Sequence, residues 1–189
     1  MEGSKRGYIF KTVVVGDGAV GKTSLVMQFT EQKFNQQYIM TIGSNFALKL
    51  IPSDALSTDE NEYPDVRLQL WDLAGQPHFK AVRHPFYKGS SGVIFVFDVT
   101  RPATLDNLRG WRNEILKQVD EETPSIMLAN KIDLEGERKV SEEDGKKLAE
   151  EFGCVEYFET SAKEGVNVNV GFKTLARAIV DYLKKHDRL

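Results

Sequence analysis

Six short runs of aliphatic, β-branched and aromatic residues alternate with segments of helical periodicity, and this alternation restricts the fold more than any other feature. Four runs are almost continuously apolar, as expected of strands buried on both faces of a sheet. The runs are FKTVVVG (10–16), FALKLI (46–51), VRLQLWD (66–72), VIFVFDV (93–99), SIMLANK (125–131) and VEYFETS (155–161). The pattern predicts an α/β domain with a six-stranded, mostly parallel sheet and helices on both faces.

Three amphipathic helices are expected between and after these strands, with their apolar stripes in the core. The first precedes Pro124, the second begins at Ser141 with Asp144 and closes at Gly153, and the third ends the chain. The stripes comprise Leu105, Leu108, Trp111, Ile115 and Val119; Leu148 and Phe152; and Val168, Phe172, Leu175, Ile179 and Leu183.

The second and third runs have no helical segment between them. They are separated by PSDALSTDENEYPD (52–65), which is polar, acidic and bounded by prolines. We therefore expect one antiparallel edge hairpin with a long exposed tip.

Length and charge bound the other possibilities. A chain of 189 residues fits one domain, which we place at 8–185 between tails at 1–7 and 186–189. The formal net charge of −3 provides no basic field for nucleic acid, and no run is long and apolar enough for membrane insertion. We expect a monomer.

The lone cysteine, Cys154, suits a reducing, cytoplasmic setting and is expected to be a buried small side chain. The chain ends in KKHDRL, so no prenylation cysteine and no lipid anchor are visible in it. Peripheral membrane association would then require a lipidated tail or a partner that is missing from this chain.

A glycine-rich motif, GDGAVGKT (16–23), joins the first strand to the helix-like stretch SLVMQF. Glycines let the backbone curl so that successive N–H groups point at phosphate oxygens, and the following helix adds its positive end. Lys22 can neutralise the outer phosphates, and the Thr23 hydroxyl can bind Mg²⁺. A phosphate site is favoured over a chance glycine turn.

Two further motifs follow the fifth and sixth strands: NKID (130–133) and SAK (161–163). Asp133 offers two acceptors for the N1–H and amino group of guanine, whereas adenine has the opposite donor pattern. Asn130 can bind the base edge or brace the loop, and the stem of Lys131 can cover the ring. The alternative is a lysine-rich surface turn, but two such loops at neighbouring strand ends can enclose one base.

The motifs GDGAVGKT, YIMTIG, WDLAGQ, NKID and TSAK occur in this order, and the chain resembles the Ras superfamily of small GTPases over about residues 8–185. The TIG motif with the Phe three positions on, WDLAGQ and FYKGS are most similar to the Rab branch. The resemblance implies a P-loop NTPase fold that binds GTP or GDP with Mg²⁺. It also implies hydrolysis of GTP as a regulatory switch.

The resemblance also assigns residues position by position. Cofactor-binding residues would be Gly16, Asp17, Gly18, Ala19, Val20, Gly21, Lys22, Thr23, Ser24, Phe34, Thr41, Gly75, Asn130, Lys131, Asp133, Ser161, Ala162 and Lys163. Metal ligands would be Thr23, Thr41 and Asp72, with Asp72 acting through water. Catalytic residues would be Gln76, which orients the attacking water, together with Lys22 and Thr41.

The segment NQQYIM (35–40) contains no arginine, so we expect slow intrinsic hydrolysis and an arginine supplied by a partner. GTPase-activating proteins, exchange proteins and effectors would bind through residues 35–45 and 72–88. A proline, Pro77, follows Gln76 and should hold it extended, which is expected to slow hydrolysis.

Two other functions are weighed against this one. A nucleotide-locked scaffold would bind GTP but hardly turn it over; Gln76, Thr41 and Gly18 argue against it, while Pro77 keeps it open. A metabolic P-loop kinase or ATPase is disfavoured because NKID and SAK select guanine and no lid for a second substrate is evident.

Overall fold

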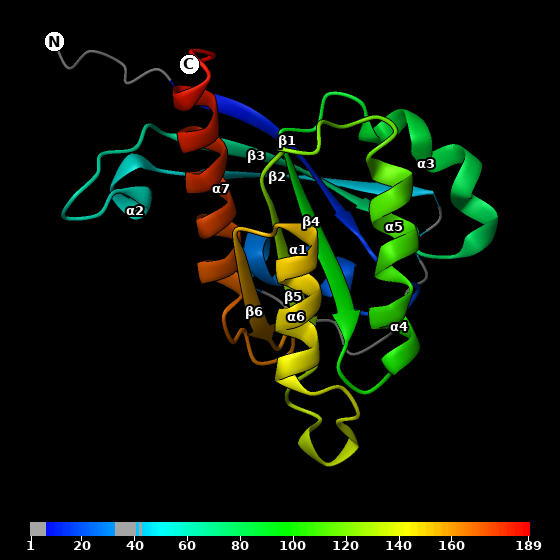
Figure 1. Cartoon of the computed structure of the whole chain (residues 1–189). Helices are drawn as coiled ribbons and strands as arrows, with labels where there is room; N and C mark the ends of the chain where they lie inside the picture. The colour runs from blue at the N-terminus through cyan, green and yellow to red at the C-terminus, as the bar shows by residue number, and fades with distance from the viewer. Residues whose placement is uncertain (1–6, 33–40, 42) are drawn as a thin grey trace, which may run out of the picture.

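The computed structural model describes residues 7–32, 41 and 43–189 and contains a six-stranded sheet (Figure 1). The strands lie in the order β2-β3-β1-β4-β5-β6. β2 runs antiparallel to β3, and the other neighbouring pairs are parallel. The bounds are β1 Tyr8–Val15, β2 Ser44–Ile51, β3 Val66–Leu73, β4 Gly92–Asp98, β5 Ser125–Asn130 and β6 Glu156–Thr160.

Helices cover both faces of the sheet. The helices are α1 Lys22–Glu31, α2 Ser53–Leu56, α3 Lys80–Tyr87, α4 Pro102–Asp106, α5 Leu108–Ile115, α6 Glu142–Phe152 and α7 Val168–Lys185. Short 3₁₀ turns, η1 Pro77–Phe79 and η2 Glu135–Glu137, lie in two of the loops. No helix in the described part of the chain is long and apolar enough to cross a membrane.

The strands supply two separate cores because successive side chains point to opposite faces. In β1, Val14 packs in the core shared with α1 and α7, whereas Val13 and Val15 pack in the core shared with α5 and α6. β4 divides in the same way, and all seven of its residues are buried. This confirms the prediction of strands buried on both faces.

The predicted fold class is confirmed, and each predicted strand lies within two residues of the observed one. The helix start at Ser141 is also confirmed: its side chain accepts the N–H of Asp144, and Gly153 ends the helix with a left-handed backbone. The helix predicted through Val119 is different. It is divided into α4 and α5 at Asn107, and α5 ends at Ile115, where a turn begins.

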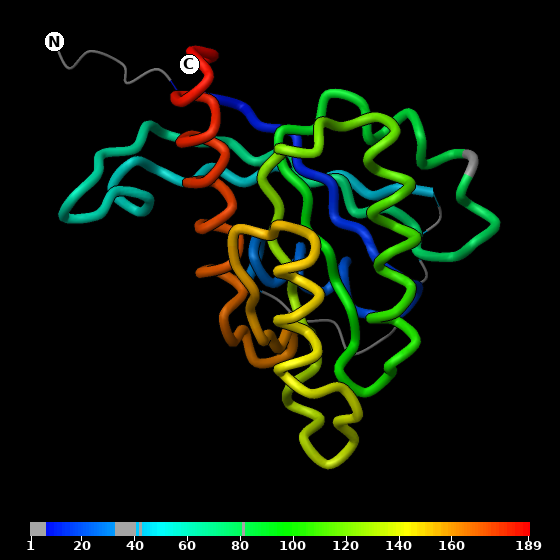
Figure 2. The backbone as a smooth tube through the Cα atoms, in the orientation of Figure 1, coloured from blue at the N-terminus to red at the C-terminus, as the bar shows by residue number. Residues whose placement is uncertain are grey.

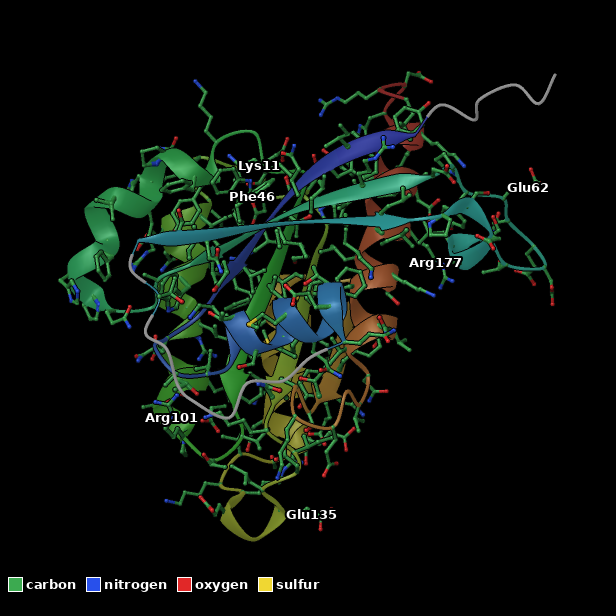
Figure 3. The ribbon with its side chains drawn as sticks, turned by 180° about the vertical axis from the view of Figure 1, so that it is seen from behind. Lys11, Phe46, Glu62, Arg101, Glu135 and Arg177 are labelled. Carbon is green, nitrogen blue, oxygen red and sulfur yellow. The ribbon has the colours of Figure 1, made fainter. Side chains whose placement is uncertain are left out.

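The tip of the β2–β3 hairpin is exposed only in part, contrary to the prediction. Its backbone reaches α7 beside the start of β3 (Figure 2), and Leu56 is fully buried there. The Nε of Arg177 on α7 donates to the carbonyl of Leu56 at 2.7 Å, and the Tyr63 hydroxyl donates to Asp181 at 2.9 Å. Figure 3 shows Arg177 and Glu62 at this end of the molecule. Two apolar side chains within the polar segment therefore fix it to the domain.

Candidate nucleotide site at the carboxyl ends of the strands

The glycine-rich loop lies between β1 and α1, at the end of the sheet where the parallel strands stop. Gly21 has φ +101°, and a Cβ there would lie 2.2 Å from the side-chain nitrogen of Asn130, so this position requires glycine. Asn130 in turn donates to the carbonyl of Val20 at 2.9 Å. The phosphate loop and the loop after β5 are thus in direct contact.

Lys22 is buried and lies across the inside of this loop. Its ammonium donates to the carbonyls of Gly16 and Asp17, both at 2.8 Å. Burial lowers the pKa of Lys22 to about 8, against the opposite effect of the nearby Asp72 carboxylate. The ammonium is held by neutral backbone carbonyls and makes no carboxylate ion pair among the described residues, so it is suited to an incoming phosphate group.

The side chain of Asp17 does not face the loop interior. Its carboxylate accepts the indole N–H of Trp111 at 2.9 Å and the amide of Asn107 at 2.7 Å. Both donors lie at or next to the start of α5. Asp17 therefore anchors the loop to this helix, and only its backbone is left to serve a ligand.

Three oxygen-bearing side chains meet beside Lys22. The hydroxyls of Thr23 and Thr41 lie 2.9 Å apart, and both contact the same carboxylate oxygen of Asp72. Asp72 is 1% exposed, and its other oxygen, Oδ1, has no hydrogen-bond partner among the described residues. Burial raises the pKa of Asp72, although Lys22 and the two hydroxyls lower it. Hard oxygen donors with an unsatisfied carboxylate fit Mg²⁺.

Gly75 and Gln76 follow β3 and lie against the phosphate loop. A Cβ on Gly75 would lie 2.3 Å from the backbone carbon of Asp17, so its backbone approaches the loop as only glycine can. The Gln76 side chain lies against Gly18, and its Oε1 is buried without a partner in the described structure. Gln76 has ψ 141°, the extended conformation predicted from the following proline.

The two loops predicted to enclose a base are joined to each other. Asn130 accepts the N–H of Ala162 at 3.1 Å, and the Ser161 hydroxyl donates to Asp133 at 2.7 Å. Asn130 therefore braces the phosphate loop and the loop after β6, while the second N–H of its amide can still donate to a ligand. Ser161 orients the carboxylate of Asp133, which is half-buried.

The remaining predicted residues are placed unequally. Ser24 lies in the first turn of α1, Ala19 is exposed on the loop and Lys163 is exposed after β6. Phe34 and most of the segment 35–45 lie outside the described residues.

Sequence reasoning missed three charged residues near the site. Arg83 is 3% exposed and donates to the carbonyls of Ala74 and Gln76, both at 3.0 Å. Asp98 and Arg101 lie at the end of β4 and beside the phosphate loop; Figure 3 shows Arg101 at this end of the sheet. One signal in the sequence could have identified Asp98: it is a single acid at the end of the apolar run VIFVF, and Thr100 follows two residues later.

Comparisons with known proteins agree with this arrangement. The Ras family model matches residues 11–181. Rab-13 of Bos taurus, a Ras-related protein, is 38% identical over 173 residues, which cover 92% of this chain and 81% of that protein. Rab-8 of Diplobatis ommata is 37% identical, covering 94% of this chain and 80% of that one. Rab-8B of Homo sapiens is 37% identical, covering 94% and 82%.

The match extends over most of the domain and over all the motifs in the described loops, from the glycine-rich loop to the two loops at the base end. Members bind GTP and GDP, hydrolyse GTP and act with regulators and effectors. The chain belongs to the Ras family, and it is a Rab-like GTPase that switches between nucleotide states.

Proposed function

We propose that the loops after β1, β3, β5 and β6 form one guanine-nucleotide site, with the roles predicted for their residues. The observation that carries this proposal is the meeting of Thr23, Thr41 and Asp72 next to Lys22, with one buried carboxylate oxygen that has no partner among the described residues. At the other end of the site, Ser161 orients the acceptor Asp133 toward the expected base position. The domain that contains this site spans 8–185.

Each residue has a defined task in this proposal. The amides of the phosphate loop and the Lys22 ammonium stabilise charge on the β and γ phosphates. Mg²⁺, when bound by Thr23, Thr41 and Asp72, would neutralise further charge on those phosphates. Gln76 holds the attacking water, and the Gly75 N–H and Thr41 detect the γ-phosphate.

Hydrolysis by the chain alone is slow in this proposal. Arg83, the nearest buried guanidinium to Gln76, is committed to backbone carbonyls and to Glu114, at 3.3 Å from Nε to Oε1. It is therefore not free to stabilise the transition state. An activating partner that supplies an arginine would raise the rate by about 10³–10⁵.

The switch output lies in residues 35–45 and 72–88, which exchange proteins, activating proteins and effectors would contact. An apolar cluster borders this surface: Phe46 and Trp71, which lie next to the two segments in sequence, pack together, and Trp71 packs against Phe86. We place the protein in the cytoplasm as a monomer that regulates trafficking or signalling. Contact with membranes would be peripheral and would need a lipidated segment or a partner.

The test compares nucleotides and then follows hydrolysis. Addition of GDP with Mg²⁺ should raise the melting temperature clearly more than ADP with Mg²⁺, because Asp133 pairs with guanine only. Single-turnover hydrolysis of bound GTP should then be far slower than one turnover per second. Equal stabilisation by ADP would contradict the guanine site, and several turnovers per second would contradict slow hydrolysis. No measurable hydrolysis, even with an activating protein, would favour the nucleotide-locked scaffold.

A further inference from the structure

Asp98, the last residue of β4, is an almost completely buried carboxylate between the phosphate loop and the loop after β5. Asp98 is 1% exposed and is not one of the predicted site residues. Its Oδ1 accepts the backbone N–H of Thr100 at 2.9 Å and the Thr100 hydroxyl at 2.7 Å. Its Oδ2 forms ion pairs with two cations: Arg101 through Nε at 3.0 Å and Lys131 through Nζ at 2.7 Å.

The Arg101 branch reaches the phosphate loop. While its Nε is held by Asp98, its Nη2 donates to the carbonyl of Gly18 at 3.0 Å. In a planar trans peptide the C=O and the following N–H point in opposite directions, so this bond also fixes the N–H of Ala19. Ala19 has φ +61°, a left-handed conformation that a residue with a side chain adopts at a cost. Arg101 thus helps to hold a strained part of the cradle.

The Lys131 branch reaches the base end. Lys131 lies between Asn130 and Asp133, and its own backbone has φ +73°. The backbones of Ala19 and Lys131 are therefore both strained. Lys131 binds the Asp98 carboxylate directly, and Ala19 is linked to it through Gly18 and Arg101. Strained backbone at a functional site persists only where surrounding contacts hold it.

The charge of Asp98 is maintained despite burial. Burial by itself raises the pKa of Asp98, but the bonds from Lys131 and Thr100 outweigh it, and the pKa lies below the ordinary value. The group is a carboxylate at neutral pH and can hold both cations.

We propose that Asp98 is a positioning residue that couples the phosphate loop to the base loop through Arg101 and Lys131, and that this coupling slows the release of guanine nucleotide. Release requires the nucleotide to leave both loops, and a shared anchor prevents one loop from loosening alone. This inference rests on the nucleotide site proposed above.

A double-mutant cycle tests the coupling, with release of a fluorescent GDP analogue into excess GDP as the measurement. Asp98→Asn keeps the shape and removes the charge; it should speed release by about tenfold, because it frees both cations. Arg101→Ala should speed release by about fivefold. The double variant should remain at about tenfold instead of the product, about fiftyfold, because the two residues act in one network.

Arg101→Lys gives a finer comparison. A lysine can still pair with Asp98 but lacks the fork that binds Asp98 and Gly18 together. Its release rate should therefore lie between those of the wild type and Arg101→Ala. Neither residue binds Mg²⁺ in this proposal, so each variant should show the same acceleration when EDTA is added.

The matched control is the exposed pair of Arg109 and Glu151, whose side chains are 52% and 50% exposed at a distance of 2.7 Å. Arg109→Ala and Glu151→Gln remove the same kinds of group and should leave the release rate unchanged. Independent effects that multiply to fiftyfold, or wild-type release from a folded Arg101→Ala variant, would overturn the coupling. Wild-type release from a folded Arg101→Ala variant overturns the coupling even if Asp98→Asn does not fold. A wild-type chain that fails to bind GDP would overturn the nucleotide site as well.

Discussion

The base end and the metal end of the site differ in how completely their buried polar groups are paired. At the base end, Asn130 joins Val20 and Ala162, and Ser161 joins Asp133. At the metal end, Asp72 Oδ1 and Gln76 Oε1 are buried without partners among the described residues. Both ends lie on the same sheet and use similar side chains.

This difference separates two kinds of preparation for a ligand. A fully paired network is rigid and stabilises the protein before any ligand arrives. Unpaired buried oxygens cost free energy until a cation or a water reaches them. The base end is thus preorganised before the base binds, whereas the metal end is stabilised only when a cation or a water binds. Opposite effects of mutation on the nucleotide-free protein follow from this comparison.

The largest effect is expected at the base end. Asn130→Ala leaves the carbonyl of Val20 and the N–H of Ala162 unpaired in a buried place, so the free energy of unfolding should fall by about 2–3 kcal/mol. The measurement is urea unfolding without nucleotide and with EDTA. Asn113→Ala, at an exposed position on α5, is the control and should change little. An unchanged stability for Asn130→Ala would mean that the base end is not preorganised.

A smaller effect of opposite sign is expected at the metal end. Asp72→Asn removes a buried charge whose pKa is raised, so the nucleotide-free protein should gain about 1 kcal/mol. A raised folded pKa means that the folded state binds the proton more tightly. The gain should therefore be complete at neutral pH, shrink as pH falls through the raised pKa and vanish near pH ~4.

Urea unfolding at several pH values measures this gain, with the exposed Asp106→Asn as control. The same substitution should abolish the Mg²⁺ dependence of GDP release. A loss of stability in Asp72→Asn without metal would remove the contrast between the two ends.

The smallest effect concerns how freely Gln76 moves. Pro77→Glu should raise the single-turnover hydrolysis rate by about threefold, because Gln76 is no longer restricted to an extended backbone. GDP release should not change. Pro52→Ala, an exposed proline at the start of the hairpin tip, is the control. If the rate stays the same after Pro77→Glu, then the hold of Arg83 on the Gln76 carbonyl, and not the proline, sets the position of this residue.

Most of the fold could be predicted from the sequence because periodicity and loop chemistry agreed for the strands and for α6. Continuous apolar runs such as VIFVF identified buried parallel strands, and Ser141 with Gly153 marked both ends of α6. Most residues of the candidate site could be named because they lie in contiguous motifs.

The rest depends on contacts between distant segments, which no local pattern encodes. The hold of Arg101 on Gly18 joins residues 83 positions apart, and the bond of Trp111 to Asp17 joins residues 94 apart. The contacts of the Asp17 side chain likewise could not be predicted, because the glycine-rich motif indicates a role only for the backbone of this residue. The acidic residues of the hairpin tip predicted an exposed loop, whereas the burial of Leu56 and Tyr63 fixes the tip against the domain.

The docking of that tip on α7 also bears on how the chain acquires its fold. Leu56 and Tyr63 meet Arg177 and Asp181 only across 121 and 118 residues. During synthesis the tip is made long before α7, so Leu56 stays exposed until almost the whole domain has left the ribosome. Contacts of such sequence separation form slowly because a long loop must close first. The last helix therefore completes the folding of the β2–β3 hairpin, and a chain interrupted before α7 would expose that apolar surface.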